Sequence, residues 1–405
     1  MIIGILTFYK EINFGANLQA LSTYGYLKKH GCTPLFIHYC SKEKEEKWGT
    51  QMETEMQPRC HKEFIDDVIK EQTELCRNAD DINKVIEEYG IEAIIVGSDA
   101  VLQHHLFRDR IHLSRRIISI GGTFPDSTFP NPFWGVGIDK KIKMAIMSAS
   151  CQDSEFNHFS LKLKGNMREA LNRFCYISVR DSWTQNMIKA ILGNDKLNTV
   201  PITPDPVFNF NENVCELIPN RQFVIKKYHL PDKYVLISMF GQHLDNNQLH
   251  DLKTKFQEEG IVSVALPVQT GMMFKHPFDY EISIPLNPLD WYALIKYSNG
   301  YIGSNMHPIV VALHNAVPCF SLDFYGRRNF LGMPRREKTS KVFHIMREFH
   351  VEMNYRMVIH GKTAANADEI VEGIINFPID MVRAQAAVYS QKYHQMMANL
   401  LSTMN

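Results

Sequence analysis

Three residues with side chains suited to binding or protonating an anion directly follow predicted strands. Asp99 ends the segment "AIIVGSD", Arg180 follows "YISV", and His307 lies between "YIG" and "PIVVALHNA". A guanidinium group binds carboxylates and phosphates through paired hydrogen bonds. Imidazole and carboxylate groups transfer protons in many enzyme mechanisms. Together the three residue types indicate a site for a small anionic ligand.

The position of His307 is the most informative of the three. Proline is favoured in the first turn of a helix, so Pro308 places His307 near a helix N-cap. Unpaired backbone N–H groups and the positive end of the helix dipole favour an anion there. We expect His307 to contact a phosphate or to donate a proton. Simple packing of the imidazole at the helix start is the structural alternative.

Arg180 and Asp99 each have two interpretations as well. Arg180 either pairs with a carboxylate of the protein, Asp181 or Asp205, or holds a carboxylate or phosphate of a ligand. Asp99 either caps a helix or binds or deprotonates a sugar hydroxyl. The sequence leaves both pairs of alternatives open.

The composition is typical of a globular protein. Of the 405 residues, 45% are hydrophobic and 22% are charged, and the 44 basic residues balance the 44 acidic ones, which argues against nucleic acid as a partner. The N-terminus does not resemble a signal peptide, and no stretch of about 18 apolar residues predicts a membrane-spanning helix. The eight cysteines are scattered without a CxxC pair. This is typical of a reduced compartment, so we predict a cytoplasmic protein.

The order of the predicted elements defines the expected fold. Short apolar segments alternate with amphipathic ones, first up to about residue 205 and again from about residue 233. Two successive series of strands and helices predict an α/β protein with two Rossmann-like domains. We place an N-terminal domain at residues 1–210, a C-terminal domain at residues 225–378 and a final long helix within residues 379–405.

Polar residues that follow the predicted strands mark the expected ligand site. In open parallel sheets, ligands bind beyond the carboxyl ends of the strands. The residues in question are Asn13, Gly15, Asn17, Ser98, Asp99, Arg180, Gly241, Ser304, Asn305 and His307. Each could be a turn residue or a helix cap, but their convergence from two domains favours a cleft.

Two basic segments give weaker signals. Residues 105–116 and 325–341 are rich in basic residues, and Lys338 or Lys341 could reach a phosphate. A solvated run of charge is the simpler interpretation of both segments. Residues 105–116 could alternatively contact an acceptor.

The segment 121–138 is rich in Gly, Pro and aromatic residues, which predicts a long surface loop. Its part 124–134 could touch an acceptor or a membrane. The chain contains no dinucleotide-binding, Walker, zinc-protease or nucleophile-elbow motif. We therefore expect neither a nicotinamide cofactor nor a metal ion.

Six segments, taken in order, cover most of residues 3–325. They are "GILTFYKEINFGANLQALSTYGYLKKHG", "AIIVGSDAVLQ", "KMAIMSAS", "YISVRDSWTQNMIK", "TPDPVF" and "YIGSNMHPIVVALHNAVPCFSL". Together they resemble the polysaccharide pyruvyl transferase family. No single segment is specific for the family, but the order and spacing of the segments are, and Ala100 to Leu102 depart from the Gln-Val-Trp usual in the family. The resemblance implies the glycosyltransferase-B arrangement, in which two Rossmann-like domains face a cleft and a C-terminal helix crosses back onto the N-terminal domain.

The resemblance also implies an activity, the transfer of the pyruvyl group of phosphoenolpyruvate to two hydroxyls of a sugar as a cyclic ketal, with release of phosphate. Phosphoenolpyruvate is then a co-substrate, and no further cofactor is needed. His307 is the expected general acid, Asp99 the expected base and Arg180 the residue that holds the donor. The implied donor-binding residues are Arg180, Gly241, Ser304, Asn305, Met306, His307 and Lys341, and the implied acceptor-binding residues are Asn13, Gly15, Asn17, Ser98 and Asp99.

The family expectation for the pathway is biosynthesis of a surface polysaccharide, such as a capsule or exopolysaccharide. A lipid-diphosphate-linked saccharide as acceptor would bring the enzyme to the inner face of the membrane. One rival function is a nucleotide-sugar-dependent glycosyltransferase, with Asp290 or Asp323 binding a ribose. Another is a non-catalytic carbohydrate-binding or scaffold protein, although the joint presence of His307, Arg180 and Asp99 argues against it.

Overall fold

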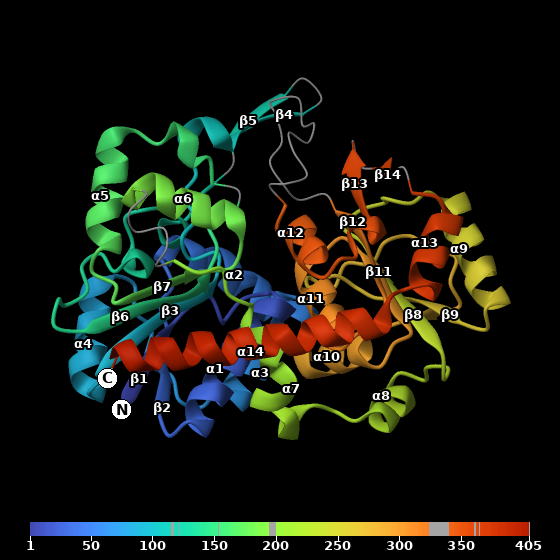
Figure 1. Ribbon diagram of the computed structural model, residues 1–405, viewed down its shortest axis with the longest axis horizontal. Coiled ribbons are helices and arrows are strands. Elements are labelled where there is room, and N and C mark those ends of the chain that lie inside the picture. The colour runs from blue at the N-terminus through green and yellow to red at the C-terminus, as the bar shows by residue number, and fades with distance from the viewer. Residues whose placement is uncertain are drawn as a thin grey trace.

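Two mainly parallel β-sheets, side by side, form the framework of the protein (Figure 1). The computed structural model describes residues 1–114, 117–120, 122–152, 154–193, 200–323, 340–359, 362–363 and 365–404. The first sheet has the strand order β2-β1-β3-β6-β7. Its strands are largely buried and aliphatic, as expected for a parallel sheet covered on both faces. They are β1 (Ile2–Leu6), β2 (Thr33–Phe36), β3 (Ala93–Asp99), β6 (Lys143–Ala149) and β7 (Tyr176–Val179).

Helix α1 is the most enclosed helix of the first half, because it packs on its own sheet and also contacts α10 and α11 of the second half. Asn13 is its N-cap, and Oδ1 of Asn13 accepts hydrogen bonds from the N–H groups of Gly15 and Ala16. Phe14 stacks on Trp291 across the two halves, with ring centroids 4.9 Å apart. The helices of the first half are α1 (Phe14–Lys29), α2 (Lys42–Thr54), α3 (Met56–Val68), α4 (Ala79–Tyr89), α5 (Leu161–Leu171) and α6 (Ser182–Leu192).

The second sheet has the strand order β10-β9-β8-β11-β12-β13-β14. Its first six strands are parallel, and β14 pairs antiparallel with β13. The strands are β8 (Tyr234–Ser238), β9 (Val262–Ala265), β10 (Tyr280–Glu281), β11 (Gly300–Gly303), β12 (Cys319–Asp323), β13 (Tyr355–Ile359) and β14 (Lys362–Thr363). The helices of this half are α9 (Asn246–Glu258), α10 (Pro288–Lys296), α11 (Met306–His314), α12 (Lys341–Glu348) and α13 (Ala367–Ile375). The predicted pair of Rossmann-like units is thus confirmed.

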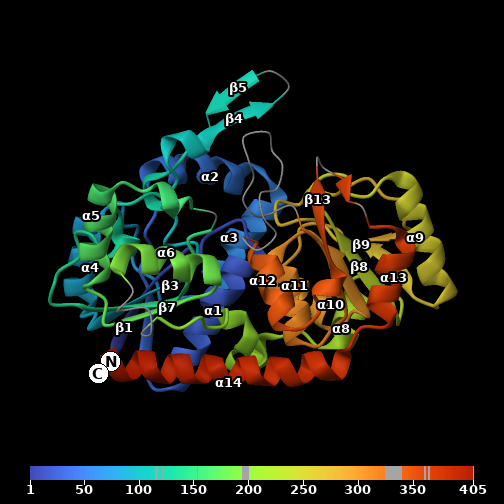
Figure 2. The ribbon, with the colours of Figure 1, turned by 45° about the horizontal axis from the view of Figure 1, so that its top comes forward.

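A connecting segment and a long C-terminal helix join the two halves. The connection contains the short helices α7 (Phe210–Asn213) and α8 (Arg221–Lys227). Helix α14 (Ile379–Met404) starts beside the second sheet and runs back along the first, so that the two chain ends lie close together (Figure 2). Along its length Tyr389 packs on Phe349, and Tyr393 packs on Tyr26. The expected return of the C-terminal helix to the N-terminal domain is therefore confirmed.

The aromatic segment differs from the surface loop that the sequence predicts. It contains two short 3-10 helices, η2 (Pro125–Ser127) and η3 (Pro132–Trp134). Phe133 and Trp134 are fully buried in the hydrophobic core of the first half. Burial of such large apolar rings stabilises the fold, so these two rings are not available to a membrane or an acceptor.

The basic segment 105–116 falls partly within the described residues. It contains the 3-10 helix η1 (Phe107–Arg110) and the strand β4 (Ile111–Ser114), which pairs with β5 (Ile117–Ile120) in an antiparallel hairpin. This hairpin projects away from the first sheet (Figure 2). Lys338 lies outside the described residues. None of the described helices is long and apolar enough to cross a membrane.

Asn213 is a buried polar connection between the linker, α1 and α14. Its Nδ2 donates to the backbone oxygen of Ser22 at 3.1 Å, to Oγ of Ser22 at 2.9 Å and to the hydroxyl of Tyr393 at 3.3 Å. We expect Asn213→Ala to lower the free energy of unfolding by about 1–3 kcal/mol, because buried groups lose their partner. Denaturant unfolding measures this effect. Asn399→Ala, at an exposed position of α14, is the control and should change stability by less than about 0.5 kcal/mol. An equal loss of unfolding free energy in the two variants would contradict the role of Asn213 as a buried connection.

Candidate active site

A cavity of about 140 Å³ lies between the two halves, at the carboxyl ends of strands from both sheets. Asp99 reaches it from the end of β3, and His307 reaches it from the first turn of α11. This is the location that open parallel sheets predict for a ligand. The lining residues are Asn13, Phe14, Gly15, Asp99, Ala100, Gln152, Ser238, Pro267, Val268, Gln269, Trp291, Asn305, Met306, His307, Pro308 and Lys341.

The imidazole of His307 packs directly against the N-terminus of α1. A methyl group added to Gly15 would lie 1.9 Å from Cγ of His307, so only glycine permits this contact. Asn305 is the N-cap residue of α11, which makes His307 the second residue of that helix. His307 thus lies at the junction of two helix starts, one from each half, as its predicted position near an N-cap implied.

The environment of His307 favours the neutral imidazole. The residue is half-buried, and its Nε2 atom is inaccessible and has no hydrogen-bond partner among the described residues. Burial lowers the pKa of His307 to about 4, although the carboxylates of Asp205 and Asp99 oppose this shift. His307 is therefore uncharged near pH 7 in the ligand-free protein.

Asp99 is held in an unusual backbone conformation, with a φ of 88°. Such strain at a non-glycine residue occurs preferentially at functional sites. Its Oδ1 accepts a hydrogen bond from the N–H of Ala100 at 2.8 Å and lies 3.9 Å from Nη2 of Arg180. Burial alone would raise the pKa of Asp99, but the positive charge of Arg180 and smaller contributions from His307 and Lys341 outweigh it, so the pKa is lowered. Asp99 is therefore ionised.

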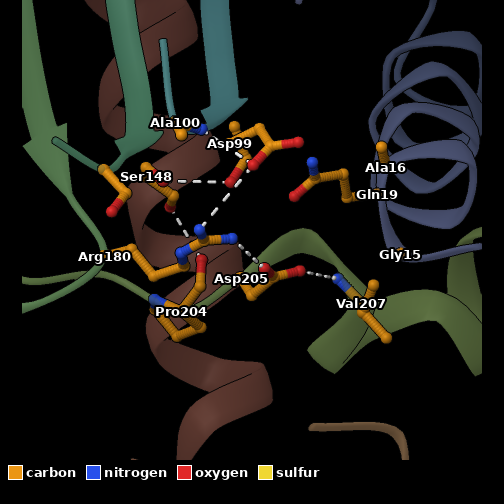
Figure 3. A network of polar contacts seen from close by, with 12 residues as sticks. Gly15, Ala16, Gln19, Asp99, Ala100, Ser148, Arg180, Pro204, Asp205 and Val207 are labelled. Carbon is orange, nitrogen blue, oxygen red and sulfur yellow. Dashed lines mark hydrogen bonds and ion pairs between the residues drawn. The ribbon is translucent and has the colours of Figure 1, made fainter. Parts of the chain in front are cut away.

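Arg180 is buried between two carboxylates (Figure 3). Its Nη1 donates to Oδ2 of Asp205 at 2.7 Å, and the carboxylate of Asp205 is itself held by the N–H of Val207. Burial opposes the charged guanidinium, but Asp205 and Asp99 more than compensate and raise the pKa of Arg180. The predicted pairing with Asp205 is therefore present. It uses only part of the guanidinium, because Nε and Nη2 have no hydrogen-bond partner within the described structure.

Arg180 opens onto a second cavity of about 110 Å³. Met306 and Lys341 line both cavities, which are therefore neighbours. The second cavity collects cationic side chains, whereas amides and aromatic rings dominate the first. The residues around the second cavity are Arg180, Ile202, Thr203, Pro204, Asp205, Phe208, Met306, Lys341, His344, Ile345, Glu348, Tyr389 and Lys392.

Four predicted site residues lie apart from the cavities. Nδ2 of Asn17 donates to the backbone oxygen of Tyr9, and Oγ of Ser98 donates to that of Ser148. Oγ of Ser304 accepts from the N–H of Phe240, and Gly241 follows at an exposed turn. Asn17, Ser304 and Gly241 therefore shape the loops around the site, whereas Ser98 links β3 to β6. The other predicted residues line one or both cavities, namely Asn13, Gly15, Asp99, Arg180, Asn305, Met306, His307 and Lys341.

Several cavity residues were missed by the sequence-based prediction. Gln152 and Gln269 lie in loops after β6 and β9, so the strand-exit rule could have found them. Trp291 lies in the first turn of α10, where nothing in the local pattern separates it from a core residue. Asp205 follows a predicted strand, and the structure shows both its predicted pairing with Arg180 and its position at the second cavity.

The two aspartates proposed as ribose ligands in the glycosyltransferase alternative are engaged elsewhere. Asp290 accepts hydrogen bonds from Nζ of Lys227 and from the hydroxyl of Tyr228. Asp323 is fully buried and accepts from the hydroxyls of Ser340 and Tyr355. Neither carboxylate is free for a nucleotide. No group of three or more His, Cys, Asp or Glu residues in the described ranges could hold a metal ion.

The amino-acid sequence of this chain matches the model of a known protein family. The model for "Polysaccharide pyruvyl transferase" matches residues 13–324, and the chain is a member of that family. A search of curated proteins finds no significant match.

Solved structures with the same overall fold include sugar-nucleotide epimerases and a glycosyltransferase. UDP-GlcNAc 2-epimerase from Neisseria meningitidis bound to UDP-GlcNAc has a TM-score of 0.53 at 10% identity, over 99% of both chains. A glycosyltransferase from Rickettsia africae has a TM-score of 0.51 at 8% identity, over 100% of this chain and 97% of that one. A putative UDP-N-acetylglucosamine 2-epimerase from Listeria monocytogenes has a TM-score of 0.50 at 10% identity, over 95% of this chain and 90% of that one. These likenesses establish the glycosyltransferase-B type fold.

The close contact at Gly15 makes a prediction about the cavity. We expect Gly15→Ala to displace His307 and to lower ligand affinity or activity at least about 10-fold, because the added methyl group occupies the space of the imidazole. Gly165→Ala in α5 is the matched control, since a methyl group there meets nothing within 4 Å. Circular dichroism and a thermal melt check that both variants fold. Full activity of a folded Gly15→Ala variant would contradict the assigned packing.

Proposed function

We propose that the protein transfers the pyruvyl group of phosphoenolpyruvate to two hydroxyls of a sugar as a cyclic ketal, with release of phosphate. The observation that carries the proposal is the cluster at the interdomain cavities. There a buried arginine with unused donors lies beside an ionised aspartate and near a neutral histidine. Membership of the pyruvyl transferase family supports the same reaction class.

The two neighbouring cavities suit the two proposed substrates. Phosphoenolpyruvate carries a phosphate and a carboxylate, and both need cationic partners. Arg180, Lys341 and Lys392 supply such groups at the second cavity. A sugar presents hydroxyls and apolar ring faces, which match the amides and Trp291 of the first cavity. Lys341 borders both cavities, so the donor and the acceptor would meet beside it.

The proposed reaction needs one acid and one base. Protonation of the methylene carbon of phosphoenolpyruvate by His307 produces an oxocarbenium-like C2, which a sugar hydroxyl attacks while Asp99 takes its proton. The C2–O bond to phosphate then breaks, the second hydroxyl adds to C2, and its proton leaves with the phosphate or a base. The products are the methyl-bearing ketal and inorganic phosphate. Arg180 would hold the donor and stabilise the charge that develops on the departing phosphate.

His307 must gain a proton before it can act as the acid. It is neutral in the free site because burial lowers its pKa to about 4. A bound phosphoenolpyruvate would bring several negative charges close to the imidazole and raise this pKa again. Donor binding would therefore protonate the acid that the reaction needs.

The proposed function includes an acceptor and a pathway. We propose that the enzyme acts in surface polysaccharide biosynthesis, on a saccharide carried by a lipid diphosphate. Family membership supports a polysaccharide-related acceptor. A purified-enzyme assay with free and lipid-linked oligosaccharides distinguishes the two forms.

Phosphate release tests the reaction directly. Purified protein should release phosphate from phosphoenolpyruvate in the presence of galactose-, glucose- or mannose-terminated lipid-linked oligosaccharides, and the productive acceptor should gain one pyruvyl mass. His307→Gln should lower this rate by about 10²–10⁴-fold, because the general acid is lost. His250→Gln, at an exposed position on α9, is the control and should retain the rate. A folded His307→Gln variant with full activity would remove His307 from the mechanism.

Proton uptake tests the proposed charge change. His307 is neutral in the free protein and would be protonated in the complex, so donor binding should take up a proton and weaken as the pH rises from 6 to 8. Titration calorimetry in two buffers of different ionisation enthalpy measures the number of protons. His307→Gln should lower that number. The same uptake by wild type and variant would show that another group titrates.

A further inference from the structure

Gln19 is a buried polar residue that the proposed reaction does not yet use. It lies one turn after Gly15 on α1 and therefore on the same face of the helix. Only 1% of the residue is exposed. Its side chain points from α1 toward Asp99 and Arg180 (Figure 3).

Both ends of the Gln19 amide, Nε2 and Oε1, lack a hydrogen-bond partner in the part of the chain that the structure describes. Gln57 on α3 is an equally buried glutamine with the opposite situation. Its Nε2 donates to the backbone oxygen of Leu286 at 2.9 Å, and its Oε1 accepts from the N–H of Leu286 at 2.7 Å. Because a buried amide without partners is costly, the contrast indicates that Gln19 serves binding rather than folding.

The groups around Gln19 define the chemistry of the missing partner. The ionised carboxylate of Asp99 only accepts hydrogen bonds, the guanidinium of Arg180 only donates them, and an amide does both. A phosphate or carboxylate oxygen could accept from Nε2, but it has no proton to donate to the ionised carboxylate of Asp99 and would be repelled by it. A hydroxyl group accepts from Nε2 and still has a proton to donate to that carboxylate. A hydroxyl is therefore the ligand group that best completes this environment.

We propose that Gln19 is an acceptor-binding residue that holds a sugar hydroxyl beside Asp99. The assignment rests on the proposed function in one respect, since it takes Asp99 as the base for that hydroxyl. Nε2 of Gln19 donates to the hydroxyl oxygen while the hydroxyl proton faces Asp99. When Asp99 removes the proton, the amide N–H remains directed at the oxygen that becomes more negative. Gln19 thus fixes the direction of the attacking lone pair.

The test compares Gln19→Met with Gln57→Met in the full-length protein. In each variant a flexible apolar side chain of similar length replaces a buried amide. Without ligand, Gln57→Met should lower the Tm by several degrees, because the backbone groups of Leu286 lose their partners. Gln19→Met should leave the Tm unchanged or raise it, since it removes two unpaired polar atoms. A fall in Tm equal to that of Gln57→Met would overturn the proposal, whatever the ligands do.

The second measurement uses defined probes. The Tm of wild type and of Gln19→Met is recorded with methyl glycosides of galactose, glucose and mannose, with phosphoenolpyruvate and with inorganic phosphate. We expect the variant to lose at least half of the glycoside-induced rise in Tm and to keep the rise caused by the two anions. A glycoside effect that is unchanged in the variant, or a loss confined to the anions, overturns the assignment to a hydroxyl. A third outcome is a glycoside-induced rise in Tm that depends on Gln19 while phosphoenolpyruvate changes the Tm of neither protein. In that case the assignment of Gln19 stands and phosphoenolpyruvate is not the donor.

Discussion

The burial of one positive charge determines how the site is built. A guanidinium removed from water is stable only when carboxylates and hydrogen bonds replace its hydration. Arg180 follows β7, and the two carboxylates that compensate it come from the end of β3 and from the turn at Asp205. Three separate parts of the first half must therefore meet at one point. The same charge keeps Asp99 ionised, so a requirement of the fold also prepares a functional group.

Helix α1 brings the second half of the molecule to this charge cluster. Its first turn carries no side chain at Gly15, and the imidazole of His307 fills that space. Next to this contact Phe14 stacks on Trp291, which adds an apolar contact to the interface between the two halves. A polar network of Asn17 and His61 extends this interface. Nδ1 of His61 contacts Oδ1 of Asn17 at 2.7 Å, and Nε2 of His61 contacts the backbone oxygen of Gln269, in the second half, at 3.0 Å. The cavity is thus a product of how the halves touch and belongs to neither alone.

The sequence predicts the framework of this arrangement better than its details. Buried parallel strands have a recognisable apolar pattern, so the two units and the strand ends that carry Asp99, Arg180 and His307 could be located. Side-chain direction at a loop depends on tertiary contacts, however. For this reason the sequence did not separate Asn13, which lines the cavity, from Ser98, which hydrogen-bonds within the first sheet.

Other features are invisible to local patterns. A helical glutamine such as Gln19 looks the same whether its amide is satisfied or not, because its partners are distant in the chain. Gly and Pro dominate the pattern of the segment 121–138 and predict a surface loop, although the segment also contains several aromatic residues. Their burial follows from the space that the folded first half leaves for Phe133 and Trp134.

Helix α14 has a mechanical consequence for the cleft. At 1.5 Å per residue, its 26 residues form a continuous rod of about 39 Å that lies along both halves. Tyr389 fastens the rod to the second half through Phe349 and the carboxylate of Glu348, and Tyr393 fastens it to the first half. A rod attached at both ends resists wide hinge opening more than sliding along its own axis. The helix therefore couples mechanically the two halves between which the cavity lies.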